Sequence, residues 1–99
     1  MATIFLGDPD RDSRMVLAAL IEALGHRVVY EPVDGVDAAV IEPAYAKAVT
    51  AVAERQLPVV CVTGRRRSIT GQRLNPVAYL EKPVLVGPFV RAVTAAAAD

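Results

Sequence analysis

The six residues PVVCVT at positions 58–63 are apolar as far as their final threonine. A strand buried on both faces has this composition, and such strands occur in parallel sheets covered by helices on both sides. Residues 37–41, with the sequence DAAVI, have the same character after their first aspartate. The two stretches therefore predict a helix-covered parallel sheet.

Helices and strands alternate along the chain on either side of these two stretches. Apolar residues at positions 16, 17, 20, 21 and 24 recur at spacings of three and four, which predicts an amphipathic helix that ends before Gly25. Strands are expected at 3–7, 27–30, 37–41, 58–63 and 77–80, and helices at 12–24, at 44–56 and from Pro88 onward. This order predicts an α/β fold with three layers and a mostly parallel, five-stranded sheet.

Two connections are shorter than this architecture normally has. Only residues 31–36 join the second strand to the third, whereas a parallel crossover usually needs about ten or more residues. We therefore expect no helix there. Either the chain crosses in an extended path, or strand two is displaced or pairs differently, for which Asp34-Gly35 offers a hairpin turn. After the strand at 58–63, the polar sequence allows at most a short helix near residues 70–74.

Composition excludes several classes of protein. The chain has 99 residues and balances 11 Lys and Arg against 11 Asp and Glu, so it lacks the basic field typical of direct nucleic-acid binding. Its longest uncharged stretches are too short to cross a bilayer, and no basic leader precedes Asp8. With Cys61 as its only cysteine, it forms no internal disulfide. We expect one cytoplasmic domain over residues 1–99, away from membranes.

Four polar residues lie at the expected carboxyl ends of strands, where sheets of this kind carry their sites: Asp8, Glu42, Thr63 and Lys82. In this order they resemble the receiver domains of response regulators, the CheY-like proteins of two-component signal transduction and phosphorelays. The resemblance covers segments 4–8, 22–26, 37–43, 58–63 and 78–83, of which the last, AYLEKP, is the most specific. It implies a flavodoxin-like or CheY-like sheet. Compared with a standard receiver, the short connections leave the helix between strands two and three missing and the helix after strand four reduced.

The departures from the receiver pattern concern the phospho-acceptor pocket. The second acid of the family's acidic pair, which ligates magnesium, falls on Pro9, and the acceptor aspartate falls on Glu42. Proline cannot ligate a metal, and the glutamate carboxylate lies one methylene further out. Phosphoryl transfer depends on positioning and on charge neutralisation by the metal, so phosphorylation is not expected. The resemblance therefore implies an atypical, stand-alone pseudo-receiver that acts by protein–protein interaction, without enzymatic activity or cofactor.

Two roles remain open for Glu42. In the first, Glu42 mimics a phosphorylated aspartate, pairs with Lys82 and accepts a hydrogen bond from Thr63. In the second, it is a relic, that is, a residual polar residue that Lys82 neutralises and that has no role in signalling. The enzyme-like alternative is a receiver that is phosphorylated on Glu42 or Asp10.

Arginines at 65, 66, 67 and 73 offer a second alternative function. Arg65, Arg66, Arg67 and Arg73 form a solvated loop, or they bind an anionic nucleotide or second messenger beside the pocket.

Acidic residues at positions 8, 10 and 12 have the spacing of the first ligands in a calcium-binding loop. Ser13 and Ala19 stand where that loop needs a glycine and a glutamate, so we expect no metal site. Asp8 and Asp10 are the weaker metal-binding alternative, and helix capping is the expected role of at least one of these acids.

The missing helix also suggests how the chain associates. Without that cover, the apolar side chains of strands one and three on one sheet face are expected to meet water or a partner. We expect a homodimer, with Val33 and Val36 at its margin, alongside a signalling partner protein.

Overall fold

The computed structural model describes residues 1–64 and 69–98, which form a five-stranded sheet. Its strands are β1 (Thr3–Gly7), β2 (Arg27–Val29), β3 (Ala38–Ile41), β4 (Val59–Thr63) and β5 (Ala78–Glu81). They lie in the order β2-β1-β3-β4-β5, and every neighbouring pair is parallel. The expected CheY-like architecture is thus confirmed, with strands within one or two residues of their predicted positions.

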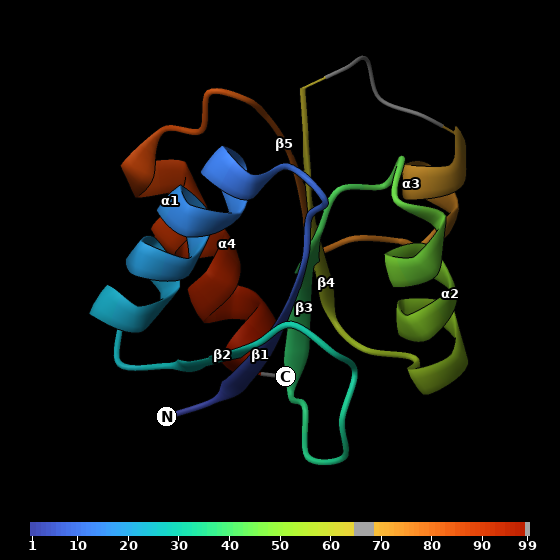
Figure 1. The fold of residues 1–99 in the computed structure, drawn as a ribbon, viewed down its shortest axis with the longest axis horizontal. Coiled ribbons are helices and arrows are strands. Elements are labelled where there is room, and N and C mark those ends of the chain that lie inside the picture. Colours follow the sequence, from blue (N-terminus) through green and yellow to red (C-terminus); the bar gives the residue numbers. More distant parts are fainter. Residues whose placement is uncertain (65–68, 99) are drawn as a thin grey trace.

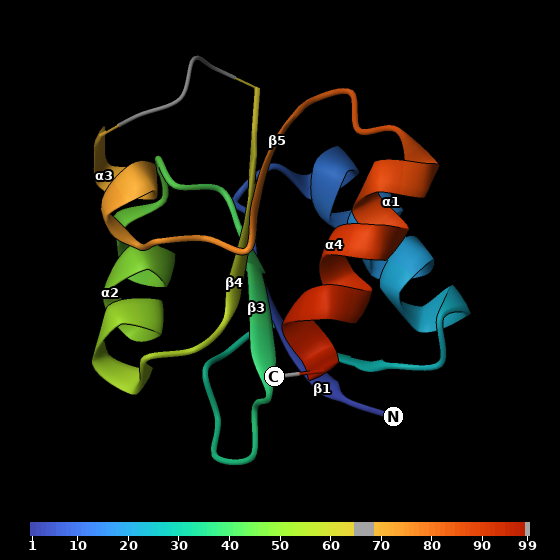
Figure 2. The same cartoon turned by 180° about the vertical axis from the view of Figure 1, so that it is seen from behind.

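Helices cover both faces of the sheet (Figure 1). Helices α1 (Arg11–Ala23) and α4 (Val86–Ala98) lie on one face, and α2 (Ala46–Arg55) and α3 (Ile69–Arg73) lie on the other, as the reverse view also shows (Figure 2). Residues 30–37 are all described and contain no helix, and α3 has only five residues, so both predicted reductions are found. Within residues 1–64 and 69–98, no helix has the length and apolar character needed to span a membrane.

The strands alternate their side chains between two hydrophobic clusters. In β1, Ile4 and Leu6 point toward α1 and α4, whereas Phe5 points toward α2. The first core cluster includes Ile4, Leu6, Leu17, Ile21, Val40, Val60, Val62, Phe89 and Val93. The second core cluster comprises Phe5, Ala39, Ile41, Ala48, Ala51, Val52, Val59 and Cys61.

Residues 30–37, hereafter the crossing segment, lead from β2 past β1 to β3 and turn at Asp34-Gly35 on the way (Figure 1). Because β2 and β3 both pair in parallel with β1 and lie on its two sides, the hairpin alternative at Asp34-Gly35 is wrong. The segment is held to α2: Arg55 Nη2 donates to the Pro32 carbonyl at 2.7 Å, and Lys47 Nζ lies 3.6 Å from Glu31 Oε2.

The sheet face expected to be open is in fact covered. Phe5, Ala39 and Ile41 are at most 3% exposed, so the apolar side chains of β1 and β3 meet neither water nor a partner. The crossing segment contributes Val36, which packs against the second core cluster. Helix α2 also packs close to β1, since a Cβ on Gly7 would lie 2.6 Å from the Ala48 Cβ. The predicted dimer face is therefore not available.

Candidate functional site

The carboxyl ends of four strands carry the polar residues that the sequence singled out. Asp8 follows β1, Glu42 follows β3, Thr63 ends β4 and Lys82 follows β5. Asp8, Glu42 and Thr63 are the buried polar or charged residues of the described chain. Two acids and one base thus gather at one edge of the sheet, and we call Asp8, Glu42 and Lys82 the ion cluster.

Lys82 joins the two carboxylates. Its Nζ donates a hydrogen bond to Asp8 Oδ2 at 2.8 Å and lies 3.9 Å from Glu42 Oε2. Lys82 and Glu42 do meet, as expected, but the hydrogen-bonded partner of the ammonium is Asp8. The Asp8 side chain is 2% exposed, so this bond lies in a poorly solvated environment where it is stronger than at the surface.

Backbone N–H groups fix both carboxylates from the other side. The Asp10 N–H donates to Asp8 Oδ1 at 2.9 Å, and the Ala44 N–H donates to Glu42 Oε1 at 3.0 Å. Each carboxylate therefore has one oxygen held by the backbone and the other directed at Lys82. The sequence did not reveal these two amide contacts, because they depend on how the chain turns after each strand.

Pro9 and Asp10 lie outside the ion cluster. Pro9 is exposed, and Asp10 caps α1, accepting from the Asp12 N–H and from Ser13 Oγ, both at 3.1 Å. The Ser13 hydrogen bond, followed by that of the Asp12 amide, lowers the pKa of Asp10. The capping role expected for one of these acids is thus confirmed.

Metal ligands do not converge here. No three His, Cys, Asp or Glu residues in ranges 1–64 and 69–98 are grouped so as to hold a metal ion. Both Asp8 oxygens already accept hydrogen bonds from Asp10 and Lys82, and Pro9 offers no donor atom. The residues present do not fit the magnesium ion that the receiver resemblance implies, nor the calcium-loop alternative.

Thr63 lies beside the ion cluster and is 2% exposed. Its carbonyl accepts the backbone N–H of Lys82 at 2.7 Å, which fixes the start of the segment after β5. The hydrogen bond from its hydroxyl to Glu42 stays a prediction.

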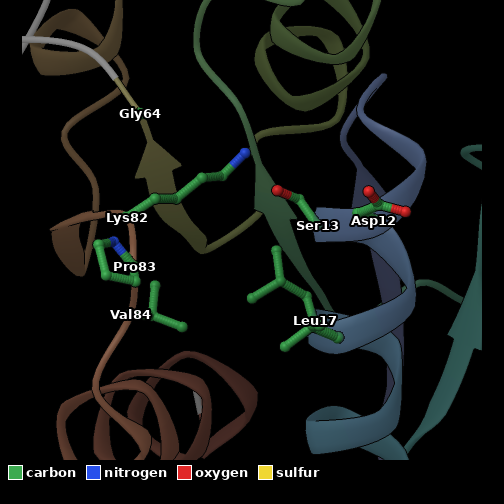
Figure 3. Close-up of a pocket in the computed structure, with 8 residues that line it drawn as sticks. Asp12, Ser13, Leu17, Gly64, Lys82, Pro83 and Val84 are labelled. Carbon is green, nitrogen blue, oxygen red and sulfur yellow. The ribbon is translucent and has the colours of Figure 1, made fainter.

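A pocket of about 540 Å³ adjoins the ion cluster (Figure 3). It lies between the first half of α1 and the segment after β5, and the Lys82 side chain crosses its upper end in this view. The sequence did not single out most of its lining, which comprises Asp12, Ser13, Val16, Leu17, Gly64, Lys82, Pro83 and Val84. No sequence motif marks this pocket, because its lining residues come from a helix and from loops that are far apart in the sequence.

Arg73, the arginine of this set that the structure describes, does not line this pocket. Arg73 instead lines a separate pocket of about 370 Å³, formed with residues of α2 and with Leu74 and Asn75. The expectation that Arg73 lies beside the ion cluster is therefore wrong, because α3 directs it toward the C-terminal end of α2. Arg65, Arg66 and Arg67 lie outside the described residues.

Cys61 and His26 have structural roles. Burial, and secondarily the charge of Glu42, raises the pKa of the Cys61 thiol to about 11, so this thiol is protonated near neutral pH. His26 is half-buried, and its Nδ1 accepts the Ala2 N–H at 3.0 Å.

Solved structures of known proteins share this arrangement of strands and helices. A response regulator receiver protein from Pseudoalteromonas atlantica is 17% identical, with a TM-score of 0.76 and 94% of each chain covered. The signal receiver domain of a modulated diguanylate cyclase from Desulfovibrio desulfuricans G20 is 20% identical, with a TM-score of 0.78, and the match covers 99% of this chain and 94% of that one. The receiver domain of the sensor histidine kinase PA1611 from Pseudomonas aeruginosa PAO1, with magnesium coordinated in its active-site cleft, is 16% identical, with a TM-score of 0.80 and coverages of 99% and 98%.

This chain therefore has the fold of response regulator receiver domains. Comparison with models of protein families and with curated proteins gives no match. At these identities the likeness concerns the fold, and the chemistry has to be argued from the ion cluster itself.

Proposed function

We propose that residues 1–99 form a single receiver-like domain that signals through contact with a partner protein and is not phosphorylated. The observation that carries this proposal is the ion cluster: Lys82 bonds to Asp8 directly, and Pro9 stands where the receiver pattern has its second acid. The domain would be a pseudo-receiver of the cytoplasm, without enzymatic activity or a cofactor.

The first argument concerns the metal. The Pseudomonas receiver holds magnesium in its active-site cleft. Here Pro9 removes one carboxylate from the ligand set that the resemblance implies, and the remaining Asp8 has both oxygens engaged by N–H donors. A divalent cation would have to displace the Lys82 ammonium from a bond in which the acid is almost fully buried.

The second argument concerns the acceptor. Phosphoryl transfer needs an acceptor oxygen in line with the phosphodonor and a cation that neutralises the developing charge. The Glu42 side chain is 11% exposed, and the Ala44 N–H holds one of its oxygens. A carboxylate fixed in this way and lacking a metal is poorly placed to attack a phosphodonor.

The constitutive charge of Glu42 gives this domain a fixed state. A carboxylate that faces Lys82 from the acceptor position supports a phospho-mimic, whereas the distance of 3.9 Å and the shorter Asp8–Lys82 bond support a relic. In both cases the output is a protein surface that does not change with phosphorylation, and the partner is a signalling protein.

Intact-mass measurement after incubation with acetyl phosphate and magnesium tests this proposal. We expect no added phosphoryl group on the wild-type chain. The matched variant Pro9→Asp/Glu42→Asp restores both missing elements and is expected to gain one phosphoryl group under the same conditions. A phosphoryl group on the wild type that disappears in Glu42→Gln or Asp10→Asn would establish the phospho-accepting alternative instead.

A further inference from the structure

The outer side of α1 is unusually apolar for a surface helix. Met15 and Val16 are 60% and 57% exposed, and Ala19 and Ala23 on the same side are also exposed. The opposite side of the helix buries Leu17 and Ile21 in the first core cluster, which leaves the outer side exposed among residues 1–64 and 69–98. In Figure 1, α1 forms the left flank of the molecule. Helices with one packed face normally carry polar residues on the other face.

Two charges at the ends of this side, Arg11 and Glu22, oppose the helix dipole, whereas Asp12 in the first turn agrees with it. Arg11 is the first residue of α1, where the dipole favours an acid, and Glu22 lies in its last turn, where the dipole favours a base. Both side chains are exposed, and among the described residues neither has an ion-pair partner. The stability of the isolated helix therefore does not account for this arrangement.

We propose that α1 is the surface through which two copies of this chain associate, with the two helices antiparallel about a two-fold axis. Arg11 and Glu22 are eleven residues apart, which is close to three helical turns, so both lie on the same side of the helix. An antiparallel pair places Arg11 of each copy opposite Glu22 of the partner subunit. The charges that are unfavourable within one helix become complementary between two.

Side-chain size agrees with the same geometry. The two-fold axis passes near the middle of α1, between Met15 and Ala19. Met15 of each copy then faces Ala19 of the partner subunit, so that a long side chain covers a small one. A parallel arrangement would instead place Arg11 against Arg11 of the partner subunit and Met15 against Met15 of the partner subunit. The charge pattern therefore selects the antiparallel pairing.

Neighbouring apolar residues extend this surface. Leu85 and Val86, where α4 begins, are 72% and 58% exposed, and the preceding residue Val84 lines the pocket together with Val16 of α1. Helix α1 has 13 residues and spans about 20 Å, so its contact is smaller than a standard interface. We accordingly expect a dissociation constant in the micromolar range rather than an obligate dimer.

The dimer deepens the proposed function, because it names a second copy as one partner of the unphosphorylated domain. Analytical ultracentrifugation from low to high micromolar concentration tests it with charge-reversal variants. Arg11→Glu and Glu22→Arg each make both symmetry-related pairs repulsive, and each is expected to raise the dissociation constant about tenfold. The double variant Arg11→Glu/Glu22→Arg restores opposite charges and should recover wild-type association.

These variants separate association from folding. Each reversal improves the interaction of its own charge with the helix dipole, so neither should weaken the fold. Lys47→Glu and Glu54→Arg make matched charge changes on α2, which covers the opposite sheet face, and are expected to leave association unchanged.

A wild-type chain that stays monomeric at high micromolar concentration would refute the dimer. So would a double variant that fails to recover, since antiparallel pairing requires recovery. Intact-mass measurement on the same samples after acetyl phosphate treatment keeps the two proposals apart: a monomer that gains no phosphoryl group contradicts the α1 interface only, and a phosphorylated dimer contradicts the unphosphorylated function only.

Discussion

Replacing Lys82 by methionine removes the charge of the ion cluster while keeping a side chain of similar length. The stem of Lys82 lines the pocket beside α1, and methionine preserves most of this packing. The Asp8 carboxylate, 2% exposed, loses its 2.8 Å hydrogen bond, and Glu42 loses the cation 3.9 Å from its Oε2. Two neighbouring carboxylates are then left without the positive charge that both faced.

The expected loss of unfolding free energy is about 3 kcal/mol near neutral pH. Removing one member of a buried ion pair costs about 3–5 kcal/mol, and the lower end applies because the Lys82 side chain is 23% exposed. The same change at an exposed pair provides the control. Lys47 lies 3.6 Å from Glu31, with both side chains about two-thirds exposed, so Lys47→Met should cost less than about 0.5 kcal/mol.

Urea denaturation of the single variants and of Lys82→Met/Asp8→Asn measures these losses of unfolding free energy. If stranding of the Asp8 charge causes the loss, the double variant should be more stable than Lys82→Met, because asparagine tolerates the site without a counter-ion. A loss below 1 kcal/mol in Lys82→Met, or a double variant less stable than the single one, would refute this reasoning.

Three other changes test the packing around the site. Gly7→Ala should cost about 2–3 kcal/mol in urea denaturation, because its Cβ would lie 2.6 Å from the Ala48 Cβ, and Ala48→Gly should relieve part of this cost; equal losses with and without Ala48→Gly would contradict a steric cause. Native Cys61 should resist iodoacetamide at pH 8, and the stability should fall as the pH rises from 9 toward 11, because the unfolded chain releases the thiol proton first; rapid alkylation of the folded protein would disprove this. Arg55→Ala removes the 2.7 Å bond to the Pro32 carbonyl and should speed amide hydrogen exchange in residues 30–37, with exchange in β4 unchanged; equal acceleration in both would indicate global destabilisation instead.

Much of the fold could be predicted from the sequence because its signals are local. The apolar spacing in residues 12–24 defines one helix, and the uncharged stretch 58–63 defines a strand buried on both faces. The short length of the connection between β2 and β3 was enough to exclude a helix there. The cover of the second sheet face could not be predicted in this way, since it depends on how closely α2 approaches Gly7 and on where Val36 packs.

The partner of Lys82 shows why the site was harder to predict than the fold. In the sheet order, β5 is two strands from β3 and three from β1, so strand spacing alone favours Glu42, which follows β3, as the nearer acid. The chain turns immediately after β1, and the Asp10 amide holds Asp8 with its other oxygen toward Lys82. Hydrogen bonds in this turn, rather than the strand order, decide which acid receives the ammonium.

The residue at position 9 affects the Asp8–Lys82 bond through the total charge of the ion cluster. The Lys82 ammonium offsets one of the two carboxylate charges of Asp8 and Glu42, and backbone amides stabilise the one net negative charge that is left. A third acid at position 9 would double that charge, and a divalent cation would then become the favourable counter-ion. With Pro9 in that place, the ammonium is free to bond with Asp8 at 2.8 Å instead of competing with a metal. The state of this edge of the sheet should therefore be independent of magnesium concentration, as the proposed constant surface requires.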